Sequence, residues 1–268
     1  MDFKSFKNKI LYKLFRLVPG ANYRMLLKQY VKVSEIVPEA ASEAWNLLHT
    51  NLQWQKKNRK SAKIVSLGYD CMIRTYTTIY MLKPGKRCGE KSLPFDLAIT
   101  PPEMVLHFLQ NDFQDYCSDN WYYDPGTTWW HNTPETGVFY PHDTDCGPED
   151  LEKIQFRLKQ RIENFREILN FPGMLFFIVH KTSTSKAEVF TAIKEQLEIK
   201  RKGKPFKILV IASDHDEECK AIEGMEYFYH PYPRADYIWH AKNMRYTPDG
   251  IAYEMCIAQR CQQFVNLQ

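Results

Sequence analysis

The sequence lacks long hydrophobic runs, and its cysteines lack the spacing of a disulfide or metal-binding framework. No apolar run approaches the roughly 20 residues that a membrane-spanning helix requires. The seven cysteines are odd in number and irregularly spaced, without a CxxC pair. No secretory signal is visible, because Lys13 and Arg16 interrupt the apolar stretch 10–18. Free thiols in a reducing compartment are therefore expected, which favours a cytoplasmic protein.

Net positive charge is missing from most of the chain. The formal net charge is +4, from 36 Lys and Arg against 32 Asp and Glu. Residues 1–33 contain eight basic residues against Asp2 alone, so this segment carries +7 and the remaining residues carry −3. Because the basic character belongs to the N-terminal segment, we expect no nucleic-acid-binding surface on the main domain.

The N-terminal segment has the pattern of amphipathic helices. Apolar residues recur at helical spacing over 3–17, and lysine and arginine lie on the opposite face. One interpretation is a helix lying on anionic lipid at the inner membrane face, and the other is a helix docked on the domain. With a helix over 34–51 and a polar linker over 53–63, this pattern predicts an N-terminal part over 1–60 and an α/β domain over 61–268.

Strand and helix patterns alternate after residue 62, which predicts a single α/β domain with a mainly parallel central sheet flanked by helices. The expected strands cover 64–68, 174–179, 206–212 and 225–230. The expected helices cover 72–82, 148–169, 185–200 and 248–265, with a further helix capped by Thr100 ahead of two prolines. Residues 116–148 are expected to form an irregular functional loop. Ligands of such sheets lie beyond the carboxyl ends of the strands, here at 68–71, 180–182, 213–216 and 230–233.

Cys71 is a candidate nucleophile because it follows the glycine turn at the end of the first expected strand. Gly68 ends the β-rich run, and Tyr69 and Asp70 lead into Cys71 near the start of a helix. Unpaired N–H groups and the helix dipole at such a position stabilise a thiolate. The backbone donors of Gly68, Tyr69 and Asp70 are candidates for holding an oxyanion. The competing interpretation is a buried packing cysteine.

Two histidines are candidate bases for this thiol. His142 follows a short expected strand and lies beside Asp143, and a neighbouring carboxylate stabilises a protonated imidazole. Asp96 is a candidate for orienting a catalytic histidine, or else it caps local backbone. Asp236 and His240 precede the last helix. An Asp–His pair at that position can serve as the base and the orienting carboxylate for a nucleophile placed after the first strand. The alternative interpretation of each histidine is a loop residue whose side chain is hydrogen-bonded to local backbone.

The acidic run 214–219 and the tryptophan-rich loop are the remaining candidates. Acidic residues are expected at the start of a helix, so we interpret 214–219 in that way and predict no metal or cofactor. Trp121, Trp129 and Trp130 have the chemistry to stack on a sugar or a peptide. Alternatively, the same rings pin the loop to the domain.

The order of these motifs resembles a bacterial family of unknown function whose members are described as papain-like cysteine peptidases. The matching residues are Ser66-Leu67-Gly68 with Cys71, then Pro94-Phe95-Asp96, then His142-Asp143. The resemblance covers roughly residues 62–215. It implies that Cys71 is the nucleophile and His142 the base, with Asp143 or Asp96 as the orienting carboxylate. It also implies a peptide, amide or ester substrate, including a glycan-linked one, and a papain-like α+β fold as the alternative architecture.

Three functions remain open from the sequence. The first is a hydrolase or acyl transferase that uses Cys71 and His142. The second is an arrangement similar to SGNH-type esterases, in which Cys71 replaces the usual serine and Asp236 and His240 complete the site. The third is a non-enzymatic module that binds a glycan, a nucleotide-sugar or a protein through the loop 121–131.

Overall fold

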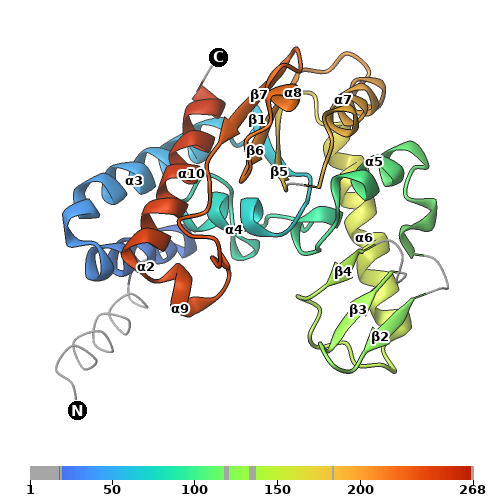
Figure 1. Cartoon of the computed structure of the whole chain (residues 1–268), viewed down its shortest axis with the longest axis horizontal. Helices are drawn as coiled ribbons and strands as arrows, with labels where there is room; N and C mark the ends of the chain where they lie inside the picture. The colour runs from blue at the N-terminus through green and yellow to red at the C-terminus, as the bar shows by residue number, and fades with distance from the viewer. Residues whose placement is uncertain (1–17, 19, 118–120, 133–136, 183, 267–268) are drawn as a thin grey trace. The chain divides into compact units, whose positions relative to one another are not determined.

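The computed structural model describes residue 18 and residues 20–117, 121–132, 137–182 and 184–266 (Figure 1). The chain forms two compact units, each assembled from separate segments. The helical unit contains the described residues up to Arg59, Thr75–Glu90 and those from Tyr232 onward. The sheet unit contains Lys60–Arg74 and the described residues of Lys91–Pro231.

The sheet unit is built on a four-stranded parallel sheet in the order β1-β5-β6-β7 (Figure 1). Its strands are β1 (Ala62–Ser66), β5 (Met174–Lys181), β6 (Phe206–Ala212) and β7 (Met225–Tyr229). The central strands β5 and β6 are almost entirely buried, as their continuous runs of Phe, Ile, Leu and Val require. The predicted α/β class, with a mainly parallel sheet flanked by helices, is confirmed.

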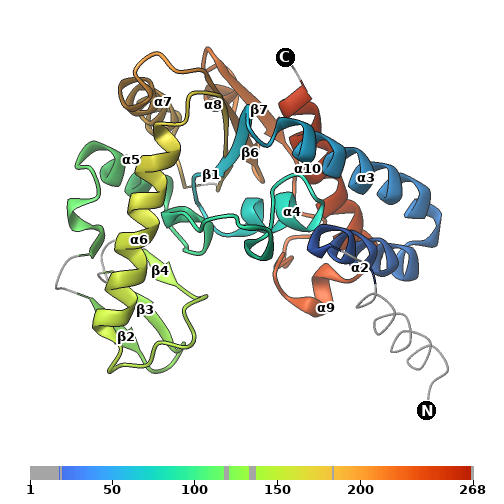
Figure 2. The same cartoon turned by 180° about the vertical axis from the view of Figure 1, so that it is seen from behind.

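Helices cover the sheet with faces whose apolar residues follow helical spacing. They are α5 (Pro102–Gln110), α6 (Leu151–Leu169), α7 (Ala187–Arg201) and the short α8 (Glu217–Lys220). In α6, Ile154, Leu158, Ile162 and Phe165 recur every three to four residues and are buried in the core of this unit. Burial of each such side chain contributes about 1.5–3 kcal/mol, so packing rather than intrinsic propensity holds α6 in place. Figure 2 shows α5, α6 and α7 grouped beside one another.

Part of the expected loop 116–148 folds into a second sheet. Strands β2 (Tyr122–Asp124), β3 (Trp129–His131) and β4 (Phe139–Tyr140) pair antiparallel in that order, after the short 3-10 helix η5 (Gln114–Cys117). Both views show this sheet beside one end of α6 (Figures 1 and 2). The expectation of an irregular segment was wrong for β2 and β3, which buried aromatic side chains order, whereas β4 lies within the short strand expected ahead of His142.

The helical unit gathers segments that are far apart in the sequence. It contains α2 (Ala21–Ile36), α3 (Ala41–Asn58), α9 (Lys242–Arg245) and α10 (Pro248–Asn266), with the 3-10 helices η2 (Pro38–Ala40) and η3 (Lys86–Cys88). Its core combines Leu26, Leu48, Tyr80 and Ile251, all buried. Helix α4 (Met72–Ile79) begins in the sheet unit and ends in the helical unit.

The structure divides the chain differently from the expected boundary at residues 60 and 61. Residues 75–90 and those from Tyr232 onward pack with α2 and α3, because their apolar side chains share one core. The expected linker over 53–63 is instead the end of α3, a short turn and the start of β1. The predicted amphipathic helix over 3–17 lies outside the described residues. Among the described residues, no helix combines the length and hydrophobicity that crossing a membrane requires.

The start of α5 differs from the capped start expected at Thr100. The residue before the helix is Pro101, and no side chain caps it. Thr100 instead pairs with the turn that follows β1, since its N–H donates to the Tyr69 carbonyl over 2.6 Å. The residue expected to start a helix therefore braces the segment that leads to Cys71.

Candidate functional site

Cys71 lies immediately before α4, at the end of a turn that continues from β1. Beyond the strand, the Leu67 N–H still donates to the Ile178 carbonyl over 3.0 Å, so the chain stays paired with β5. Gly68 then adopts φ +85°, and a Cβ there would meet the Thr100 carbonyl oxygen at 2.7 Å. Only glycine satisfies both the backbone angle and this close approach. The glycine turn thus fixes the position of Cys71 just ahead of α4.

The structure brings Cys71 and His142 together across 71 residues of sequence. The distance from Cys71 Sγ to His142 Nε2 is 3.0 Å. Cys71 is 8% exposed, whereas His142 is exposed in the loop that follows β4. At this distance a thiol donates its proton to Nε2, or a thiolate accepts one from the imidazolium. The first turn of α4 adds the positive end of a helix dipole, which also favours the thiolate.

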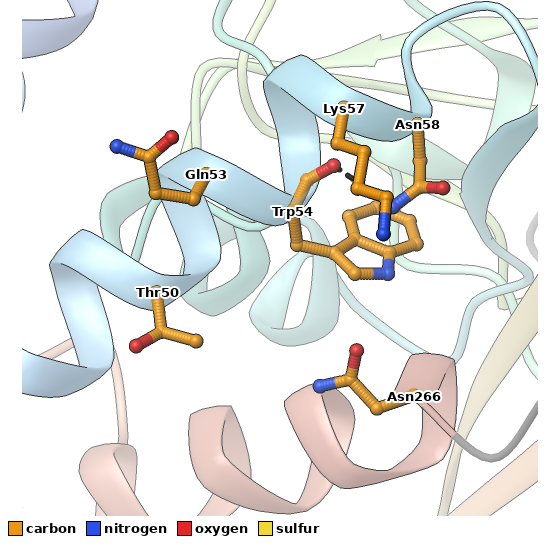
Figure 3. Close-up of a pocket in the computed structure, with 6 residues that line it drawn as sticks. All are labelled: Thr50, Gln53, Trp54, Lys57, Asn58 and Asn266. Carbon is orange, nitrogen blue, oxygen red and sulfur yellow. Dashed lines mark hydrogen bonds between the residues drawn. The ribbon is translucent and has the colours of Figure 1, made fainter.

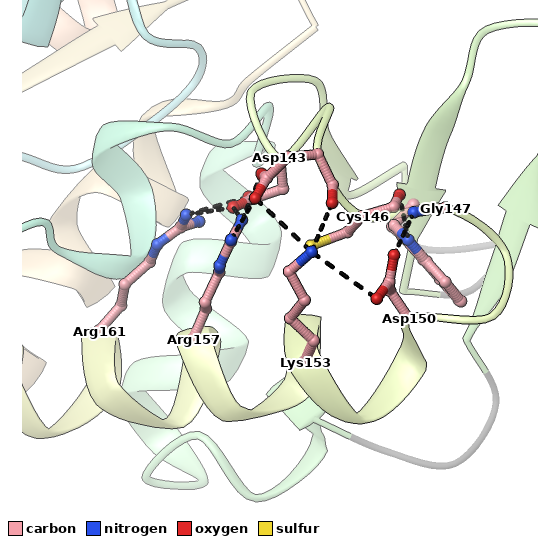
Figure 4. A network of polar contacts seen from close by, with 9 residues as sticks. Asp143, Cys146, Gly147, Asp150, Lys153, Arg157 and Arg161 are labelled. Atoms are coloured by element: carbon pink, nitrogen blue, oxygen red, sulfur yellow. Dashed lines mark hydrogen bonds and ion pairs between the residues drawn. The ribbon is translucent and has the colours of Figure 1, made fainter.

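Asp143, the residue after His142, is bound to arginines of α6 (Figure 4). Its Oδ1 and Oδ2 lie 2.7 Å and 3.0 Å from Nη2 of Arg161, and both side chains are buried. Arg157 adds a contact of 3.3 Å to Oδ1 and a second of 2.6 Å to Asp145 Oδ1. The Arg157 guanidinium holds the pKa of Asp145 well below its usual value. These ion pairs fasten the loop that carries His142 to α6.

Asp96 lies in the 3-10 helix η4 (Pro94–Asp96) and is fully buried. Its carboxylate accepts a hydrogen bond of 2.6 Å from the Ser66 hydroxyl and one of 3.0 Å from the Leu93 N–H. Arg74 Nε, in the first turn of α4, lies 3.5 Å from the same carboxylate. Asp96 therefore ties the end of β1 to the start of α4, on either side of Cys71.

Asp70 and two residues that the sequence analysis did not single out form a hydrogen-bonded array. His180 Nδ1 lies 3.2 Å from Asp70 Oδ1, and His180 Nε2 lies 3.1 Å from Ser213 Oγ. His180 is on β5 and Ser213 directly follows β6. The available signal was their position, because both occupy carboxyl ends of strands that parallel pairing brings to one edge.

The backbone N–H groups of Gly68, Tyr69 and Asp70 are the candidate donors for an oxyanion. The Tyr69 N–H donates to the His180 carbonyl over 3.4 Å, so this amide is already engaged. Burial, followed by the charge of Asp70, raises the pKa of the Tyr69 hydroxyl. Gly68 and Asp70 flank this engaged amide.

The alternative pair, Asp236 and His240, lies in the helical unit. Both residues are exposed, and Asp236 Oδ1 forms an ion pair of 3.2 Å with Arg234 Nε. The imidazole that lies against Cys71 is that of His142.

The three tryptophans of the candidate contact loop are not equally accessible. Trp121 is 7% exposed and Trp130 is 3% exposed, whereas Trp129 is half-buried. The Trp121 ring stacks on Tyr140 with 4.8 Å between the ring centroids, and Trp130 Nε1 donates to the Cys146 carbonyl over 3.2 Å. These contacts are those of core residues that pin the small sheet, so only Trp129 offers surface for a ligand.

The acidic run 214–219 is engaged within the protein. Asp216 caps α8 by accepting a hydrogen bond of 2.9 Å from the Cys219 N–H, as the sequence pattern indicates. The buried Lys181 ammonium lies 2.8 Å from Asp214 and 3.1 Å from Asp216. In the described part of the chain, no group of three His, Cys, Asp or Glu side chains is arranged to hold a metal ion.

A pocket in the helical unit lies between α3 and α10 (Figure 3). Its lining residues are Thr50, Gln53, Trp54, Lys57, Asn58 and Asn266. These side chains include no thiol, imidazole or carboxylate, so the pocket lacks the kinds of group that meet at Cys71 and His142.

Comparison with known proteins gives one family match. A family model described as "Putative papain-like cysteine peptidase (DUF1796)" matches residues 62–216. The match begins at β1 and ends at the residue that caps α8, and it includes both Cys71 and His142. No curated protein and no solved structure matches the chain.

Proposed function

The chain belongs to the family described as putative papain-like cysteine peptidases, and we propose that it is a cysteine-dependent hydrolase with Cys71 as nucleophile and His142 as base. The observation that carries this proposal is the distance of 3.0 Å between Cys71 Sγ and His142 Nε2. A nucleophile and its base must lie within hydrogen-bond reach, and this pair does so.

The dyad has the groups needed to break an amide or ester bond. His142 takes the proton from Cys71, and the thiolate attacks the substrate carbonyl carbon. When the tetrahedral intermediate collapses, the C–N or C–O bond breaks and His142 returns its proton to the departing amine or alcohol. Water, activated by the same imidazole, then attacks the thioester and releases the acid and the Cys71 thiol. An amine or alcohol in place of water would make the reaction an acyl transfer.

Backbone amides of the turn before α4 are the proposed oxyanion donors. We assign this role to the turn of Gly68, Tyr69 and Asp70, in which the Tyr69 N–H also donates to the His180 carbonyl. Donors fixed by a rigid turn cost little reorganisation when the negative charge develops. The φ of +85° at Gly68 and the bond from Thr100 to Tyr69 both support such rigidity.

Asp143 and Asp96 act in this proposal as positioning residues. Asp143 holds the backbone beside His142 through its ion pair with Arg161. Asp96 braces Ser66 and Arg74, which lie on either side of Cys71 in the sequence. Both carboxylates thereby limit the motion of the two reacting groups relative to each other.

An activated ester tests the proposal without knowledge of the natural substrate. On mixing with p-nitrophenyl acetate, the wild-type protein should release one equivalent of nitrophenolate in a burst and carry one acetyl group on Cys71. Cys71→Ala should abolish the burst, and His142→Ala should abolish it at pH 7, whereas the exposed His240→Ala should retain it. Acetylation of another thiol in place of Cys71, or a burst lost in His240→Ala, would contradict the proposal.

We also propose a cytoplasmic location, with residues 3–17 as a contact to anionic lipid. The basic charge of the N-terminal segment supports this contact. The full chain should sediment with vesicles containing phosphatidylserine, and a variant lacking residues 1–18 should not. Equal sedimentation of both proteins would refute the lipid contact.

A further inference from the structure

The array of Asp70, His180 and Ser213 joins three strand ends next to the nucleophile. Asp70 follows β1, His180 lies near the end of β5, and Ser213 follows β6. His180 is fully buried and Asp70 is 7% exposed. A buried histidine and carboxylate are costly to keep unless each is hydrogen-bonded, so their mutual contact of 3.2 Å stabilises this edge of the sheet.

The hydrogen bonds of the array indicate which ring nitrogen of His180 donates to Asp70. An ionised carboxylate only accepts, so His180 Nδ1 carries the proton that faces Asp70 Oδ1. His180 Nε2 then faces the Ser213 hydroxyl, which lies 3.1 Å away. The same Asp70 oxygen accepts a hydrogen bond of 3.0 Å from the Met72 N–H, in the first turn of α4. One oxygen atom therefore connects β5 to the residue that follows Cys71.

We propose that His180 is a positioning residue for Cys71, acting through Asp70 on the first turn of α4. The array holds Asp70, Asp70 holds Met72, and Cys71 lies between these two residues. The direction of the thiol toward His142 is thereby set from β5. This inference rests on the proposed function, since it concerns how the same nucleophile is held.

Two substitutions of His180 separate its two hydrogen bonds. His180→Asn places an amide N–H near the position of Nδ1, so it retains the bond to Asp70 and loses the one to Ser213. His180→Gln places its amide near Nε2, with the opposite result. If His180 acts through Asp70, the alkylation rate of Cys71 by iodoacetamide should stay within about threefold of wild type in His180→Asn. It should fall by about tenfold or more in His180→Gln, the expected scale for a hydrogen bond to a charged group.

Peptide mass spectrometry gives the rate for each thiol separately, so Cys219 serves as an internal control for folding. Cys219 is buried, and its labelling should stay slow in every folded variant. If His180→Gln does not fold, Asp70→Asn and Asp70→Ala supply a second matched pair. The asparagine keeps an oxygen that accepts from Met72 and His180, so it should retain Cys71 reactivity, and the alanine should lose it.

The outcomes distinguish this inference from the proposed function. Equal Cys71 rates within each matched pair, with wild-type Cys71 still activated, would overturn the inference alone. An unactivated wild-type Cys71 that is indifferent to His142→Ala would overturn both. The hydrogen bonds that link Ser213 to His180 and His180 to Asp70 have the same arrangement as those of a serine hydrolase triad. A burst with p-nitrophenyl acetate that is lost in Ser213→Ala and kept in Cys71→Ala would assign the array a catalytic role and refute the positioning role.

Discussion

At the residue scale, the surroundings of the thiols differ in a way that bears on their reactivity. Burial raises the pKa of Cys117 to about 11 and the pKa values of Cys219 and Cys261 to about 12. Burial also raises the pKa values of Cys146 and Cys256. Because alkylation requires the thiolate, a raised pKa moves the onset of reaction to higher pH. Cys71, by contrast, faces an imidazole and the start of a helix.

The glycine before Cys71 gives a first prediction, on stability. Gly68→Ala should cost about 3 kcal/mol, because the positive φ is unfavourable for alanine and the new Cβ would strike the Thr100 carbonyl. Gly203→Ala is the matched control, since Gly203 has φ +79° and open space around the added Cβ. It should cost only about 1 kcal/mol, from the backbone angle alone. Urea denaturation measures the free energy of unfolding of both variants. Equal losses would show that the turn relaxes around the added Cβ.

The sequence predicts individual candidates better than it predicts their partners. Cys71 and His142 were both recognisable, because a thiol after a glycine turn and a histidine after a short strand are local features. His180 was not singled out, since its role depends on Asp70 and Ser213, which lie 110 and 33 residues away. The binding of Asp143 by Arg161 was equally hidden, because it needs the position of α6.

At the scale of elements, α6 holds the His142 loop through a buried ion pair. Arg161→Leu should leave the Asp143 carboxylate buried with weaker compensation and cost about 3 kcal/mol. It should also slow alkylation of Cys71, because the loop beside His142 loses its anchor. Urea denaturation and the Cys71 alkylation rate at pH 7 are the two measurements.

The control for this prediction lies on the same helix. Arg166 pairs with Asp112 and Glu163, and its side chain is 41% exposed. Arg166→Leu should therefore cost less than about 1 kcal/mol and leave the Cys71 rate unchanged. If both arginine variants slow Cys71 alike, the effect belongs to α6 in general and not to the Asp143 ion pair.

Elements with strong periodicity were predicted closely, and short or polar ones were not. The expected strand over 206–212 has the bounds of β6, because a run of buried β-branched residues is unambiguous. Strands β2 and β3 were missed, since three residues carry no measurable alternation, whereas β4 lies within the short strand expected just ahead of His142. The end of α3 was taken for a linker because it is polar. Its Gln55 is in fact buried and donates to the Met81 carbonyl over 2.9 Å.

At the scale of the whole molecule, the division into units depends on contacts between distant segments. In the helical unit, the Glu254 carboxylate is fully buried and accepts hydrogen bonds of 3.0 Å from Gln29 and 2.9 Å from the Tyr80 hydroxyl. Arg245 Nε lies 2.8 Å from the other oxygen. These partners are up to 225 residues apart in sequence, so local patterns could not assign the segments to one unit.

This buried network predicts a large effect of a single carboxylate. Glu254→Ala should destabilise the protein by about 3–5 kcal/mol, since Arg245 and the polar partners would lose the group that compensates them. The exposed Glu35→Ala, on α2, should change stability by no more than about 0.5 kcal/mol. Thermal and urea unfolding followed by circular dichroism measure both. A Glu254→Ala protein as stable as Glu35→Ala would show that the network contributes nothing to holding these segments together.

The pH dependence of Cys71 alkylation, compared between wild type and His142→Ala, is the most direct measurement. Wild-type Cys71 should react with a midpoint well below the ordinary thiol pKa of about 8.5, while the thiols whose pKa burial raises stay slow until higher pH. His142→Ala should move the midpoint up to about 8.5 or beyond and slow the reaction at pH 7 by more than about tenfold. A wild-type midpoint at or above about 8.5 that His142→Ala leaves unchanged would contradict a Cys71–His142 catalytic pair.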